Sequence, residues 1–67
     1  MTATIYNLDG DIVGTASLAV NHLIEVTYRV PIALGWTPGQ VKTWQDSDTE
    51  YRLQGEGLLG IVRVVVS

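Results

Sequence analysis

Cysteine is absent from this chain of 67 residues, and histidine occurs once, as His22. Without cysteine the chain forms no disulfide and no thiolate zinc site, and a single imidazole argues against a histidine-rich metal site. Domains below roughly 70–80 residues usually need a disulfide, a structural metal or association between copies to be stable. Of these three only association is left, so we expect no metal, no cofactor and a homo-oligomer.

Charged residues are also scarce. They make up 16% of the chain, against about 25% in an average globular domain, whereas hydrophobic residues make up 46%. Apolar surface left exposed on so small a domain is typical of contacts with another subunit or with a heterologous protein partner. The net charge is −3, and the four cations are spread singly along the chain. Nucleic acid is therefore not an expected partner, because its phosphates are bound by clustered Lys and Arg.

Long hydrophobic runs and targeting signals are missing too. No stretch approaches the ~20 apolar residues of a membrane span. The opening MTATIYNLDGD has no basic region and no apolar region of the kind found in signal peptides. We therefore expect no membrane contact and an intracellular or virion-associated location. Since no linker or change in composition divides the sequence, residues 1–67 are expected to form a single β domain.

Glycine and aspartate recur at short intervals, which is typical of β-hairpins. Asp9-Gly10 separates two β-prone runs, residues 2–8 and 11–18, and suits a two-residue turn with positive φ angles. This turn predicts a register in which Tyr6 pairs with Val13 and Ile5 pairs with Gly14. The pattern as a whole predicts an all-β fold, a small antiparallel sheet or open barrel of five to six short strands in hairpin succession.

The middle of the chain is less clear. Residues 21–30 alternate between two faces with the period of a strand. Pro31 should bend or end this strand because it lacks an N–H group, and residues 32–36 then continue as a short extended piece. A helix over residues 15–25 is the alternative, since Ala16, Ala19, Val20 and Leu23 match a helical face, although β-branched and Asn residues disfavour it.

The segment Thr37-Pro38-Gly39-Gln40 has two interpretations. It fits a capping box that opens a helical turn, or a type II turn at Pro38-Gly39 that leads into a strand. The strand is favoured because VKTWQ, DSDT and EYRLQ then form a second hairpin. In this hairpin Trp44 and Tyr51 would be cross-strand neighbours, with Cβ atoms about 5 Å apart.

The final segment, residues 58–67, is apolar on both faces of a predicted strand. A strand of this kind is expected to be covered on both sides, and so short a chain has little material for a second layer. Val62, Val64 and Val66 can fill the core of one copy. The opposite face is then the expected interface with another copy, and it consists of Leu59, Ile61, Arg63 and Val65. The alternative is a closed monomeric barrel, in which residues 32–36 cover this face.

Three groups of residues are candidates for a site. Trp36, Trp44 and Tyr51 could form an aromatic platform for a carbohydrate or a peptide, although core or interface roles are favoured. The acidic pattern of Asp46, Asp48 and Glu50 could in principle hold calcium. Its sixth and twelfth positions are Tyr51 and Gly57 instead of the glycine and glutamate of a calcium loop, so we expect a solvated turn and no metal.

His22 is the remaining candidate, as an acid or base. On a strand it would point away from Glu25, and no nucleophile motif or phosphate-binding loop accompanies it. We therefore expect no catalytic residues. The sequence favours a non-enzymatic, homo-oligomeric structural or protein-interaction module, for example a virion or assembly component. The alternative is a small ligand-binding module that uses the aromatic platform.

Overall fold

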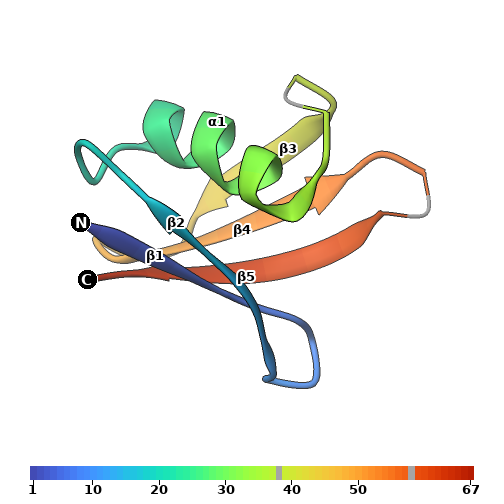
Figure 1. Ribbon diagram of the computed structural model, residues 1–67, viewed down its shortest axis with the longest axis horizontal. Coiled ribbons are helices and arrows are strands. Elements are labelled where there is room, and N and C mark those ends of the chain that lie inside the picture. Colours follow the sequence, from blue (N-terminus) through green and yellow to red (C-terminus); the bar gives the residue numbers. More distant parts are fainter. Residues whose placement is uncertain (38, 58) are drawn as a thin grey trace.

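The computed structural model of the protein describes residues 1–37, 39–57 and 59–67, which contain five strands and one helix. The strands pair antiparallel in a single sheet of order β2-β1-β5-β4-β3, with β2 and β3 at its edges. The mostly β fold is thus confirmed, and the sheet is open (Figure 1). In chain order the elements are β1 (Thr2–Tyr6), β2 (Ile12–Ser17), α1 (Leu23–Leu34), β3 (Val41–Gln45), β4 (Glu50–Gly55) and β5 (Gly60–Val66).

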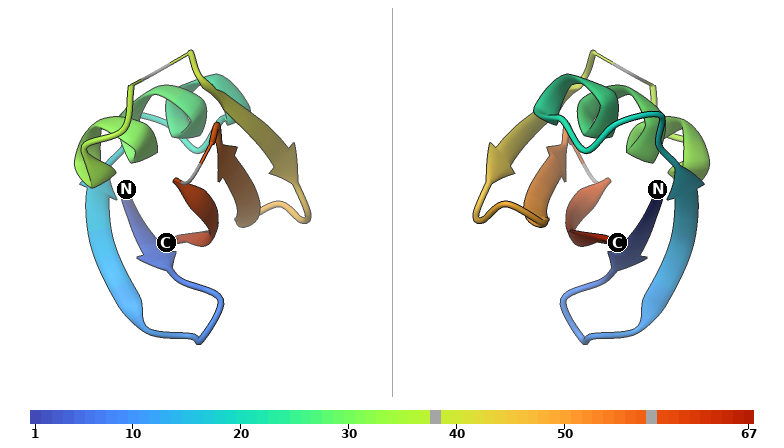
Figure 2. Two further views of the ribbon diagram at one scale, coloured as in Figure 1. Left: turned by 90° about the vertical axis from the view of Figure 1, so that its right-hand side faces the viewer. Right: turned by 90° about the vertical axis from the view of Figure 1, so that its left-hand side faces the viewer.

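The sheet curls, and α1 lies across its concave face between the two edge strands (Figure 2). The hydrophobic core fills the space between α1 and this face. Val62, Val64 and Val66 of β5 are buried in it, as their alternation predicted. The rest of the core consists of Ala3, Ile5, Leu18, Val26, Val30, Tyr51 and Leu53. Among the described elements, α1 covers the concave face and none covers the convex outer face (Figure 2).

The hairpin of β1 and β2 is confirmed, but its turn has three residues instead of two. The Asn7 N–H donates to the Asp11 carbonyl at 2.9 Å, so residues 8–10 form the loop. The Asn7 side-chain Oδ1 also accepts from the N–H groups of Asp9 and Asp11, which is a local bond that Asn favours in turns. Gly10 supplies the positive φ of 89°. The hydrogen bonds that the Asn7 side chain accepts therefore favour a three-residue loop over the predicted two-residue turn.

The longer turn changes the register next to it. Ile5 pairs with Gly14 as predicted, but Tyr6 pairs with Ile12 instead of Val13. The irregularity is a β-bulge, which leaves one residue of a strand unpaired and restores the register beyond it.

Helix α1 overturns the prediction for the middle of the chain. The strand over residues 21–30 and the extended piece over residues 32–36 are wrong, and the alternative helix over residues 15–25 is misplaced, because β2 runs to Ser17 and α1 begins at Leu23.

The burial pattern of α1 explains the error. A strand would have buried Ile24 and Tyr28 together with Val26, yet they are 73% and 53% exposed. Val26 and Val30 lie one helical turn apart and are both fully buried. Packing of this face outweighs the weak helix propensity of the segment, and even Pro31 lies inside the helix and is buried.

Both ends of α1 are capped. The His22 Nδ1 accepts a hydrogen bond from the Ile24 N–H at 3.1 Å, so this histidine is an exposed helix cap. Gly35 ends the helix with a φ of 75°, a left-handed conformation that glycine adopts readily. In the first turn, Glu25 accepts from the Ala19 N–H at 3.0 Å. This bond, together with the Arg29 guanidinium, holds the pKa of Glu25 below its ordinary value.

A strand follows Gln40, as the turn interpretation predicted. The Gln40 N–H donates to the Thr37 carbonyl, Gly39 has a φ of 92°, and β3 begins at Val41. Pro38, on which the turn type depends, lies outside the described residues, as does Leu58.

Candidate functional site

Four side chains form a row across the outer face of the sheet. The register pairs Tyr6 of β1 with Arg63 of β5, Arg63 with Arg52 of β4, and Arg52 with Trp44 of β3. Residues directly opposite each other project from the same face of a sheet. Their neighbours along β4 and β5 are buried on the concave side, so the row lies on the convex side. We call Tyr6, Arg63, Arg52 and Trp44 the cross-strand row.

Each arginine of the row lies over an aromatic ring. The Arg63 Cζ is 4.7 Å from the centre of the Tyr6 ring, and the Arg52 Cζ is 5.6 Å from that of the Trp44 ring. Both distances are within the range of about 6 Å at which a cation interacts with an aromatic face. The rings therefore hold both guanidinium groups against the sheet, with an aromatic side chain at each end of the row.

Each arginine also has a carboxylate partner. The Arg63 Nη1 is 3.1 Å from Glu50 Oε1, and the Arg52 Nε is 2.9 Å from Asp46 Oδ2. These side chains are 40–54% exposed, and ion pairs of this exposure contribute little to stability. Two arginines directly opposite each other on neighbouring strands repel. Stability of the single chain therefore does not explain the row.

Part of the predicted interface lies beside the row. Ile61 is 39% exposed and Val65 is half-buried, and both project from β5 on the same side as Arg63. Trp44, which is 41% exposed, joins them from β3. The segment of residues 32–36 lies at the end of α1, on the concave side (Figure 2). The closed barrel, in which that segment would cover this face, is therefore wrong.

Leu59 does not share the face of Ile61. A Cβ placed on Gly55, whose neighbours Tyr51 and Leu53 point into the core, would lie 2.6 Å from the Leu59 Cβ and 3.2 Å from the Trp36 Cε3. Leu59 and Trp36 thus pack against Gly55 on the core side of the sheet. The reason is Gly60, whose φ of 91° interrupts the alternation of β5 before it reaches Leu59.

The predicted platform of Trp36, Trp44 and Tyr51 is not assembled. Tyr51 is fully buried, and its hydroxyl donates to the Asn21 Oδ1 at 2.6 Å. Trp36 packs against the core, whereas Trp44 lies on the outer face. The predicted contact between Trp44 and Tyr51 is therefore wrong.

The turn between β3 and β4 explains this separation. The Asp46 N–H donates to the Glu50 carbonyl at 2.8 Å, so Asp46 extends the ladder and the pairing shifts by one residue. Tyr51 then pairs with Gln45 instead of Trp44. A shift of one residue moves a side chain to the opposite face of a sheet.

The acidic turn and His22 form no shared site. Asp46 and Glu50 bind the two arginines of the row, and the carbonyl of Asp48 accepts from the Asn21 side chain at 2.7 Å. Within residues 1–37, 39–57 and 59–67, no group of three or more histidine or acidic side chains is arranged to hold a metal ion.

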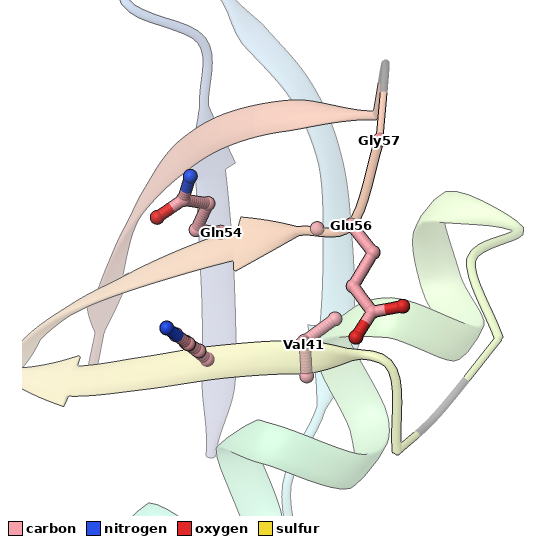
Figure 3. Close-up of a pocket in the computed structure, with 6 residues that line it drawn as sticks. Val41, Gln54, Glu56 and Gly57 are labelled. Atoms are coloured by element: carbon pink, nitrogen blue, oxygen red, sulfur yellow. The ribbon is translucent and has the colours of Figure 1, made fainter.

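Two hollows adjoin the sheet. The larger, of about 480 Å³, lies between the start of β3 and the end of β4. The Glu56 side chain extends toward Val41 there, whereas Gln54 lies farther away (Figure 3). A second hollow of about 270 Å³ lies between the β1–β2 turn and the row. It is lined by Asn7, Leu8, Asp9, Gly10, Arg52, Ile61, Val62 and Arg63.

Comparison with known proteins finds no matching family model, and neither a curated protein nor a solved structure that matches this chain. In the part of the chain that the structure describes, no helix is both long and apolar enough to cross a membrane.

Proposed function

We propose that the protein is a non-enzymatic interaction module that associates with copies of itself through the outer face of its sheet. The cross-strand row is the observation that carries this proposal. Trp, Tyr and Arg are the residue types most enriched among the side chains that dominate binding at protein interfaces. Here one Trp, one half-buried Tyr and two Arg lie in a single line across the outer face.

The charges of the outer face favour a second copy as partner. Arg52 and Arg63 are balanced by Asp46 and Glu50, so this cluster is neutral overall and carries both signs. A face with both signs can match a copy of itself around a two-fold axis, each guanidinium meeting a carboxylate of the other copy. A nucleic acid would instead meet two carboxylates within the site, on a chain whose net charge is −3.

Association of two copies also explains why the row contains two arginines that repel each other. The two opposed arginines repel within one chain, and a partner carboxylate would relieve that repulsion. Ile61 and Val65 flank Arg63 along β5 and would be covered by the same contact. An intracellular or virion-associated assembly component fits this role.

Peptide binding is the second candidate, and the hollow of about 270 Å³ beside the row favours it. It differs from the predicted aromatic platform because Tyr6 and Trp44 replace Trp36 and Tyr51. A heterologous peptide would lay a side chain in the hollow and stack on one ring.

Ile61→Asp tests the proposal, because it places a charge in the contact while the side chain stays accessible to water in the single chain. The solution mass of wild-type protein, measured by light scattering from micromolar to millimolar concentration, should approach twice 7.3 kDa. The variant should remain folded by circular dichroism and have the mass of a single chain. Ile24→Asp is the matched control, since Ile24 is exposed on α1 and its variant should associate like wild type.

A further inference from the structure

The hollow beside the row has an exposed leucine on its rim. Leu8 lies in the β1–β2 turn, lines the hollow and is 78% exposed, the highest value among the exposed large hydrophobic side chains described. Turns favour Gly, Asn, Asp, Ser and Pro, and this one is organised by Asn7 and Gly10 without help from Leu8. The fold of the single chain therefore does not explain a leucine at this position.

The hollow fits an aliphatic side chain. Its volume of about 270 Å³ is well above the roughly 10–15 Å³ that a single water molecule needs on the same measure, so it has room for an isobutyl group. Ile61 contributes apolar surface, and Arg52 and Arg63 of the row lie at the same hollow. An aliphatic group that entered it would cover Ile61 and come close to both guanidinium groups.

Asp9, next to Leu8, supplies a negative charge that can pair with an arginine of the row in another copy. Among the described residues its carboxylate forms no ion pair. Each arginine of the row makes one hydrogen bond to its own carboxylate, although a guanidinium has five N–H donors. The two arginines of the row therefore have further N–H groups that can donate, and the Asp9 carboxylate in the β1–β2 turn can accept.

We propose that two copies associate around a two-fold axis, with Leu8 of each copy in the hollow of the other and Asp9 facing the partner's Arg63. The contact is self-complementary because the projecting side chain and the hollow adjoin each other on one surface. This inference rests on the proposed self-association, and it names the residues that enter the contact.

Leu8→Ser tests the apolar part. Loss of one buried aliphatic side chain raises a dissociation constant about 10- to 150-fold, and the two-fold contact loses two, so sedimentation equilibrium should show a constant at least about 100-fold above that of wild type. Leu8→Met keeps an aliphatic side chain of similar size and should associate nearly as wild type does. Ile24→Ser, at a similarly exposed position on α1, should leave the constant unchanged.

A charge exchange tests the orientation. Asp9→Arg would place two arginines together in each half of the contact, and Arg63→Glu would place two carboxylates together, so each variant alone should associate weakly. When the two variants are mixed, every half of the contact pairs opposite charges, and a one-to-one heterodimer should form with near wild-type affinity.

The outcomes separate the inference from the proposed function. If Leu8→Ser associates as tightly as wild type while Ile61→Asp does not associate, the outer face is the interface and the Leu8 contact is wrong. Failure of the mixed variants to recover association would likewise overturn the pairing of Asp9 with Arg63. If wild-type protein has the mass of one chain at millimolar concentration, both the proposed self-association and the Leu8 contact are wrong.

Discussion

Replacing Arg52 by threonine separates two roles that the cross-strand row could have, one in the fold and one in association. In the single chain, Arg52 forms a half-exposed ion pair with Asp46, worth about 0–1 kcal/mol. It also contacts the Trp44 ring, which at an exposed site adds about 0.5–1 kcal/mol. Against these gains, Arg52 lies directly opposite Arg63, which costs about 0.2–1 kcal/mol.

These contributions partly offset each other, and the middle of each range leaves a net change of less than about 1 kcal/mol in the free energy of unfolding of the single chain. For a domain of this size that corresponds to a shift in Tm of at most about 8 °C. The association of two copies should weaken at least about tenfold, as expected when an arginine is removed from the centre of an interface.

The assay needs a form that does not associate, because association itself raises apparent stability. Thermal and urea unfolding of Ile61→Asp, with and without Arg52→Thr, gives the effect on the single chain. Sedimentation equilibrium of Arg52→Thr alone gives the effect on association. A loss of more than about 2 kcal/mol in the single chain, with unchanged association, would show that the row serves the fold and not association.

Three further predictions concern the scaffold. Gly55→Ala should lower the free energy of unfolding by about 1–3 kcal/mol in urea denaturation, because its Cβ would lie 2.6 Å from that of Leu59; an unchanged midpoint would contradict this packing. His22→Ala should cost about 0.5–2 kcal/mol through loss of the helix cap, whereas His22→Asp should keep the Tm at or above that of wild type. Since Glu25 has a lowered pKa in the folded state, its stabilisation is present above the ordinary value of 4.5 and is lost as the pH falls through the lower folded value. Glu25→Gln should therefore flatten the acid side of a plot of stability against pH, and equal slopes for both proteins would show that the bond from Ala19 is absent.

Short-range patterns were enough to predict most of the sheet. The alternation of β5 placed Val62, Val64 and Val66 in the core, and two Gly- or Asp-containing turns marked the hairpins. These signals succeed because a strand and its neighbour in the chain are fixed by local turn chemistry and by which face is apolar.

The helix could not be predicted in the same way. The β-branched and Asn residues argued against a helix in this part of the chain, and the apolar residues fitted a strand period. What decides the outcome is tertiary, since the concave face of the sheet needs a cover and Val26 and Val30 provide one. Gly35 was a usable signal, because glycine directly after an apolar stretch marks a helix end.

The row was missed for a different reason. The four residues of the row are placed together by three strand registers. Two of these depend on the turns that join β3 to β4 and β4 to β5, and the third pairs β1 with β5, which come from opposite ends of the chain. Asp46 joined the ladder at the turn between β3 and β4, so Trp44 moved away from Tyr51 and next to Arg52. Of the row, sequence analysis proposed Arg63 and Trp44 for separate sites, and nothing in the sequence pointed to Tyr6 or Arg52.

Contact between copies through the outer face can be followed by nuclear magnetic resonance of backbone amides as the concentration is raised from micromolar to millimolar. Association through this face predicts concentration-dependent shifts at Tyr6, Arg52, Ile61 and Arg63 and in the β1–β2 turn. It predicts none at the exposed residues Ile24 and Tyr28 of α1. Shifts centred on α1, or a spectrum that does not change with concentration, would contradict it.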